Sequence, residues 1–173
     1  MTMSFKTLLA ATLLVFGLSA KTSAKSFNPD SVMRRGYRGT VEAAFHLNIY
    51  NGGRDYTGQS FMTTHGYLFC PYAFLGFSTG YNRADEEPSA VLVPMLLNLR
   101  LYAPIKRLGR FTPYADLRYG PVYLLYDDGI GGAWMTHAAF GVRYALGRKT
   151  ALSLSLGYES YFEGLDMRLG FEF

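Results

Sequence analysis

The sequence predicts an all-β fold, a closed antiparallel barrel of eight strands that run up and down. Eight segments alternate apolar and polar residues with a period of two, which is the side-chain period of a strand. Each segment has roughly 9–14 residues, enough for a tilted strand to cross a bilayer. The connections are rich in Gly, Pro, Asn and Asp, as tight turns are. An even number of strands of this length is typical of a barrel that spans a membrane.

The segment 165–173 shows the alternation most clearly. Apolar residues take every second position, and three charged residues and a glycine take the others. One face of this strand is therefore apolar and the other is polar, but the strand alone does not reveal which face meets water. The apolar set is Leu165, Met167, Leu169, Phe171 and Phe173, and the polar set is Asp166, Arg168, Gly170 and Glu172.

The first two strands differ in clarity. The strand predicted at 37–50 alternates cleanly and ends at the turn residues Asn51-Gly52-Gly53. The strand predicted at 60–69 is ambiguous, because both of its faces mix polar and apolar residues. We interpret Thr63 and His65 as facing inward there.

The third and fourth strands are predicted at 72–81 and 91–102. Cys70-Pro71 makes the reversal before the third strand, and Cys70 is the single cysteine, which excludes an intramolecular disulfide. By composition, the run that opens the fourth strand would also suit a buried helix. Pro94 argues against a helix interior, so the strand is favoured.

The last four strands are predicted at 111–126, 133–146, 152–159 and 165–173. Asp127-Asp128-Gly129 begins the loop after the fifth strand, and Gly147-Arg148-Lys149 forms the turn after the sixth. Each of these strands keeps one apolar face and one face with charged or small polar residues.

The charges indicate which face is enclosed. On the seven clear strands, one face carries five Arg and five acidic residues, while the other carries no charge and neither face carries Lys. Arg is the base best suited to desolvated, bidentate pairing with carboxylates. We therefore predict a polar interior filled by side chains, with the apolar face in lipid and no pore. The charged residues are Arg38, Arg100, Arg118, Arg143 and Arg168 with Glu42, Asp116, Glu159, Asp166 and Glu172.

Strand order and depth also predict ion pairs. We expect Arg168 near Glu42 and Glu172 near Arg38, since the last strand closes on the first. Arg100 and Arg143 are both expected within reach of Asp116. A soluble lipocalin-like lipid carrier, with these charges in water and an apolar ligand inside, is the alternative.

The connections predict the orientation. The turns after the fourth and sixth strands carry only bases, Lys106, Arg107, Arg110, Arg148 and Lys149. The opposite end is acidic. Since the N-terminus is expected in the periplasm, the acidic end is expected to face the outside of the cell. Aromatic residues near strand ends are placed for interfacial girdles, namely Tyr37, Tyr81, Phe111 and Tyr144. The acidic end carries Asp55, Asp85, Glu86, Glu87, Asp127, Asp128 and Glu163 against Arg54 and Arg83.

Residues 1–24 are predicted to be a signal peptide, followed by a periplasmic lead at 25–36 and the barrel at 37–173. Lys6 supplies the positive region, residues 8–18 the apolar region, and cleavage is expected after Ala20 or Ala24. Cleavage after Ala24 would remove Lys6 and Lys21 and lower the formal net charge of +4 by two, so the charge gives no argument for nucleic acid.

Three motifs carry a family resemblance: Gly36-Tyr37-Arg38-Gly39, Thr64-His65-Gly66-Tyr67 and Pro71-Tyr72-Ala73-Phe74-Leu75-Gly76. With them the chain resembles the small outer-membrane β-barrel proteins common in Bacteroidetes, which share the architecture of OmpA/OmpX-type barrels. The resemblance covers about Gly36 to Phe173. The last strand also resembles the C-terminal strand by which bacterial outer-membrane barrels are recognised for insertion. These resemblances imply outer-membrane lipids and the barrel-insertion machinery as partners.

For function, the sequence favours a non-enzymatic structural or surface protein of the outer membrane, with no cofactor and no metal site. A lipid-modifying enzyme is the alternative, and it would need Ser, His and a carboxylate together. His137 and Glu159 form the best candidate pair, but Ser160 and Thr136 are predicted on the opposite face, so no triad assembles. We interpret His46, expected near Arg168 and Asp166, as a satisfied interior histidine.

The acidic loops suggest one further contact. Asp127-Asp128 and Asp85-Glu86-Glu87 could bridge divalent cations to lipopolysaccharide phosphates, because hard cations prefer carboxylate oxygens. The plain alternative is a solvated acidic loop.

Overall fold

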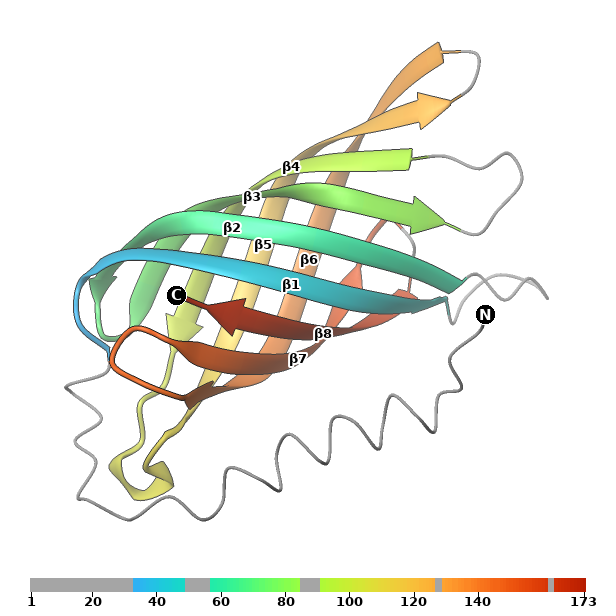
Figure 1. Ribbon diagram of the computed structural model, residues 1–173. Helices are drawn as coiled ribbons and strands as arrows, with labels where there is room; N and C mark the ends of the chain where they lie inside the picture. Colours follow the sequence, from blue (N-terminus) through green and yellow to red (C-terminus); the bar gives the residue numbers. More distant parts are fainter. Residues whose placement is uncertain (1–32, 49–56, 85–90, 127–128, 162–163) are drawn as a thin grey trace.

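A computed structural model describes residues 33–48, 57–84, 91–126, 129–161 and 164–173. Eight antiparallel strands form a closed barrel in which every strand pairs with its neighbours in sequence (Figure 1). One 3-10 turn within these ranges, η3 (Lys106–Leu108), lies between β4 and β5. The strands are β1 (Gly36–Asn48), β2 (Thr57–Cys70), β3 (Ala73–Ala84), β4 (Val91–Tyr102), β5 (Phe111–Tyr126), β6 (Gly129–Ala145), β7 (Ala151–Glu159) and β8 (Gly164–Glu172).

No helix within these ranges is long and apolar enough to cross a membrane.

The barrel closes where β8 pairs with β1, from Thr40↔Glu172 to Asn48↔Gly164. Backbone hydrogen bonds in both directions between Gly39 and Phe173, each 2.9 Å long, extend this seam to the last residue. A Cβ on Gly39 would lie 2.5 Å from two ring carbons of Phe173, so the glycine lets the terminal ring lie flat over the seam. The alternation at 165–173 thus places the whole final strand in the closed sheet.

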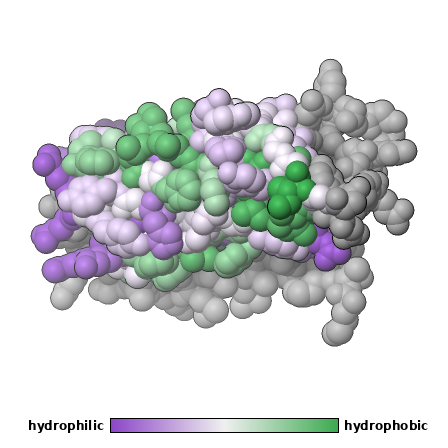
Figure 2. All heavy atoms as spheres, turned by 90° about the horizontal axis from the view of Figure 1, so that it is seen from above, coloured by the Kyte–Doolittle hydropathy of each residue, from purple (hydrophilic) through white to green (hydrophobic). Residues whose placement is uncertain are grey.

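Burial follows the predicted faces on the seven clear strands. Leu97 and Phe140 are 60% and 78% exposed, whereas Arg118 is 2% exposed. The charges therefore lie inside, and the leucines and aromatics lie outside. Figure 2 shows one side of this surface, on which hydrophobic and weakly polar residues cover the middle and most strongly hydrophilic residues gather toward one end.

The predicted facing of β2 is wrong. Ser60, Met62, Thr64 and Leu68 face inward, and Thr63 and His65 lie on the outer face with Phe61, Tyr67 and Phe69. The three aromatic rings determine which face of β2 points outward, because a large ring fits poorly into a narrow polar lumen and fits well into lipid. The two polar residues on this face bond laterally: His65 Nδ1 lies 2.5 Å from the Tyr37 hydroxyl, and His65 Nε2 lies 2.9 Å from Thr63 Oγ1.

Two strands begin well before their predicted first residue. β2 begins at Thr57 rather than at 60, and β6 begins at Gly129 rather than at 133. The early start of β6 arises because it pairs with β5 as far as Tyr126↔Gly129, through glycines that carry no alternation signal. β7 pairs with β6 only from His137, so the β5–β6 hairpin extends beyond β7 (Figure 1).

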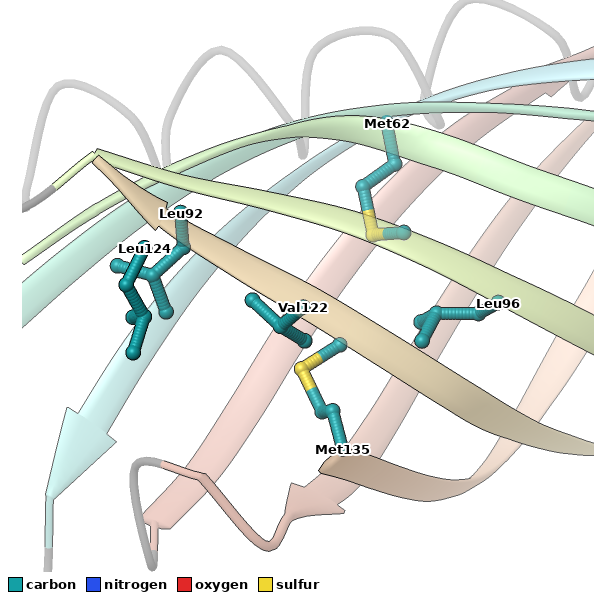
Figure 3. Close-up of a cluster of buried hydrophobic side chains, with 6 residues drawn as sticks. All are labelled: Met62, Leu92, Leu96, Val122, Leu124 and Met135. Atoms are coloured by element: carbon teal, nitrogen blue, oxygen red, sulfur yellow. The ribbon is translucent and has the colours of Figure 1, made fainter. Parts of the chain in front are cut away.

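The lumen is filled in three zones. A charged middle separates two apolar clusters. One, drawn in Figure 3, consists of Met62, Leu92, Leu96, Val122, Leu124 and Met135 from β2, β4, β5 and β6. The other lies at the end where β1 begins, and consists of Leu68, Phe74, Tyr102 and Tyr114 with Met33 from the predicted lead. Met33 is 3% exposed and helps to close that end.

The structure leaves some predictions untested. The signal peptide, its cleavage site and most of the lead lie outside the described residues, as do Asp85-Glu86-Glu87, Asp127-Asp128, Asp55 and Glu163.

The lipid-facing surface can be tested by placing a charge on it. Phe140 lies between the aromatic pairs Phe111–Tyr144 and Tyr119–Trp134, near the middle of the outer face. We expect Phe140→Arg to lower the free energy of unfolding by about 2–4 kcal/mol, as guanidinium groups do at a bilayer midplane. Denaturant titration in phosphatidylcholine vesicles measures this, with Ile105→Arg in the turn before η3 as the control. If Phe140→Arg lowered the free energy of unfolding less than Ile105→Arg does, this result would indicate that the outer face meets water.

Candidate functional site: the charged lumen

Four side chains form a ring of alternating charge in the middle of the lumen. Arg100 Nη2 lies 2.7 Å from Glu42 Oε1, and Arg100 Nε donates to Asp116 Oδ2 at 2.7 Å. Arg118 Nη2 lies 2.6 Å from Glu42 Oε2, and Arg118 Nε donates to Asp116 Oδ1 at 2.8 Å. Asn98 adds a hydrogen bond to Asp116 Oδ1 at 2.8 Å. Each base therefore contacts both acids, which balances the charge.

This ring crosses the lumen. Glu42 comes from β1, while Arg100 comes from β4 and Asp116 and Arg118 from β5, on the far side of an eight-stranded closed sheet. The Met62 sulfur on β2 also accepts hydrogen bonds from Arg118 at 3.7 Å and from Arg168 at 3.3 Å. The side chains thus meet from opposite walls.

A second group lies on β6, β7 and β8. Arg168 pairs with Asp166 on its own strand and with Glu159 at 3.1 Å. His137 Nε2 lies 3.1 Å from Asp166 Oδ1. The spacing Asp166–Arg168 places both residues on the inner face of one strand, just as Asp116 and Arg118 lie together on β5.

A third group lies at the end where β1 begins. Arg143 binds Glu172 with two nitrogens, Nε at 3.0 Å and Nη2 at 2.9 Å. Arg38 lies 3.4 Å from the same carboxylate and donates to the backbone carbonyls of Lys149 and Arg34. One carboxylate therefore connects β6, β8 and β1 at this end.

The predicted ion pairs are partly correct. The pairs Glu172–Arg38 and Arg100–Asp116 are confirmed. Among the described residues, Arg168 forms its ion pairs with Asp166 and Glu159 rather than with Glu42, because these two acids are nearer on β8 and β7. Arg143 pairs with Glu172 rather than with Asp116, which Arg100 and Arg118 already occupy.

The candidate pair His137 and Glu159 lies as predicted, directly opposed in the β6–β7 register. Both side chains are buried, and His137 contacts Asp166. Thr136 and Ser160 are on the outer face, where the Ser160 hydroxyl accepts the Thr136 N–H at 2.9 Å. No hydroxyl nucleophile therefore joins His137 from these two residues.

Sequence reasoning missed an arrangement around His46. Ser60 Oγ lies 3.0 Å from His46 Nε2, and His46 Nδ1 lies 3.7 Å from Glu159 Oε2. His46 also lies opposite Asp166 in the β1–β8 register, as expected. The wrong facing assigned to β2 concealed Ser60. Reading the aromatics of 61–69 as one lipid-facing set would have revealed it.

Asn82 is the neighbour of Ser60 on β3. Its side chain is completely buried, and neither of its amide atoms has a hydrogen-bond partner among the described residues. Ser60, His46, Glu159 and Asn82 are thus polar residues of the lumen beside the apolar cluster of Figure 3, since Asn82 pairs with Leu92 and Ser60 precedes Met62 by one inward position.

Fold and lumen together define the chain as an eight-stranded membrane β-barrel of the outer-membrane type. No protein-family model and no curated protein sequence matches it. Its structure is similar to that of neisserial surface protein A, NspA, with a TM-score of 0.65 and 13% identity over 80% of this chain and 96% of NspA. This likeness shows a shared fold.

Two further solved structures were found. The outer membrane protein OprG from Pseudomonas aeruginosa has a TM-score of 0.49 and 12% identity, over 80% of this chain and 95% of OprG. Ail, the attachment invasion locus protein of Yersinia pestis, has a TM-score of 0.45 and 10% identity, over 80% of this chain and 95% of Ail.

The central ring can be tested by unbalancing it. Asp116→Leu leaves Arg100 and Arg118 with one acid between them, and removing one partner of a buried ion pair typically costs about 3–5 kcal/mol. Asp116→Leu with Arg118→Met removes opposite charges and leaves the Arg100–Glu42 pair at 2.7 Å. We expect the double variant to be more stable than the single one in denaturant titrations. Equal or lower stability would contradict the charge-balance argument.

Proposed function

We propose that the chain is an integral outer-membrane protein with a structural or surface role and no enzymatic activity. The observation that supports this most directly is the ion pair between Arg100 on β4 and Glu42 on β1, which bridges the lumen at 2.7 Å. With Arg118 and Asp116 it fills the middle of the barrel with paired side chains. A barrel of this size then offers its surfaces, rather than a channel, to other molecules.

Outer-membrane location is supported by the apolar outer face and by the predicted signal peptide. The final strand exposes Leu165, Leu169 and Phe173, which fits the proposal that the insertion machinery recognises β8. The relationship to the small barrels of Bacteroidetes stays a prediction that rests on the three sequence motifs. The fold shared with NspA does not test this relationship.

The geometry around His46 favours the non-enzymatic proposal over a hydrolase. A distance of 3.7 Å between His46 and Glu159 is longer than a hydrogen bond, so the carboxylate does not orient the imidazole as a triad requires. Glu159 already accepts a hydrogen bond from Arg168 at 3.1 Å. Ser60 is 6% exposed. We therefore interpret Ser60–His46 as a satisfied interior pair.

Purified barrel in planar bilayers and vesicles tests both parts of this proposal. We expect no steady conductance, because paired side chains occupy the lumen, and no release of fatty acid from phospholipid or lipopolysaccharide. A porin and a phospholipase serve as positive controls. Steady conductance would refute the closed lumen, and fatty-acid release that disappears in Ser60→Ala would refute the non-enzymatic role.

We further propose that the acidic outer loops contact lipopolysaccharide through divalent cations. The support is the charge of Asp85-Glu86-Glu87 and Asp127-Asp128 in the sequence, which would attract hard cations. Changing all five to Asn or Gln should make cells more sensitive to detergent and less dependent on added Mg²⁺, whereas Arg83→Gln should not. Unchanged sensitivity in the five-fold variant would contradict the bridging role.

A further inference from the structure

Exposed basic side chains gather at the end of the barrel where β1 begins and β8 ends. They come from the segment before β1, from η3 and from the turn between β6 and β7. Among the residues that the structure describes, none of them forms an ion pair, and all five described carboxylates are buried in the lumen. The set, here called the basic patch, is Arg34, Arg35, Lys106, Arg107, Arg148 and Lys149.

Backbone hydrogen bonds hold parts of this patch together. The Arg38 guanidinium donates to the Arg34 carbonyl at 3.3 Å and to the Lys149 carbonyl at 3.2 Å, which brings the segment before β1 beside the β6–β7 turn. On the other side, the Ala145 N–H donates to the Arg110 carbonyl at 3.0 Å and connects that turn to the connection that carries η3. Three connections that are distant in sequence therefore place their basic side chains at one end of the barrel, beside one another.

The patch lies beside exposed apolar groups. Ile105 and Leu108, which flank Lys106 and Arg107, are 47% and 41% exposed. Phe111 packs against Tyr144 at the same end, with ring centroids 4.9 Å apart and the ring planes tilted by 47°. Aromatic rings mark the membrane interface of a barrel, and bases just beyond them lie at the level of lipid phosphates. A soluble polyanion would match the charges, but it would leave the exposed aliphatic groups in water.

We propose that the basic patch binds the headgroups of anionic glycerophospholipids in the leaflet that surrounds this end of the barrel. The bases contact the phosphates, while Ile105 and Leu108 enter the boundary between headgroups and acyl chains. This proposal rests on the proposed membrane location and is independent of the acidic outer loops. Figure 2 agrees with it, since the hydrophilic end of the visible face is the end that carries η3 and the β6–β7 turn in Figure 1.

The test compares spin-labelled phosphatidylglycerol with spin-labelled phosphatidylcholine at the surface of the full barrel in phosphatidylcholine vesicles. We expect the wild type to prefer phosphatidylglycerol about five-fold, which corresponds to about 1 kcal/mol for one base near a phosphate. The variant with Lys106→Gln, Arg107→Gln, Arg148→Gln and Lys149→Gln should lose this preference. Raising the salt to about 1 M should weaken it in the wild type, because the Debye length falls to about 3 Å.

The matched control is Arg83→Gln, which removes an exposed base at the opposite end of β3 and should leave the preference unchanged. Heat-modifiable migration in gels establishes that each variant is folded and inserted. An inserted wild type without the preference would overturn the lipid site and leave the membrane location intact. A preference that survives the four-fold change, or that Arg83→Gln removes equally, would also overturn it. A barrel that fails to insert at all would instead refute the membrane location.

Discussion

The need to pair every enclosed charge governs this barrel. In the part of the chain that the structure describes, ten Arg, Asp and Glu side chains lie in a lumen only wide enough for side chains, and each would be costly there without a partner. For several of the pairs, the partners stand on strands that meet only when the sheet is closed. Arg100 reaches Glu42 from the opposite wall, and Glu172 joins Arg143 to Arg38 across the β1–β8 seam. Closure and charge pairing therefore support one another.

Two apolar clusters share the lumen with these charges. The central ring occupies the middle, with the cluster around Leu96 and Met135 on one side. On the other side lie Met33, Phe74 and Tyr102, at the end where Glu172 pairs with Arg143 and Arg38. Apolar filling lowers the local dielectric around these charges, which strengthens the pairs that are well formed. It also separates the lumen from the two surfaces, which leaves the surfaces as the places where function can reside.

Much of the fold could be predicted from the sequence, because one face of most strands carries all of the charge. Leu165 to Phe173 is clear for this reason. The segment 60–69 was misread because its outer face contains Thr63 and His65, whose polar groups are satisfied by each other and by Tyr37. A hydropathy pattern does not reveal hydrogen bonds between neighbouring side chains on the same face of a sheet. Ser60 was consequently missed, and with it the contact to His46.

The ion pairs were less predictable than the faces, for a different reason. Register and depth place two residues at the same level, but several carboxylates at one level compete for each Arg. Arg100 reaches an acid across the lumen, whereas other Arg side chains bind the nearest acids on their own or the adjacent strand. Arg168 binds Asp166 and Glu159 in this way. The division between Arg and Lys was nevertheless informative. Arg retains planar hydrogen bonding when desolvated, whereas the strongly hydrated ammonium of Lys suits the ends, where Lys106 and Lys149 are exposed. The absence of Lys from the strands thus marks the enclosed face, and its presence in the turns marks the surface that meets headgroups and water.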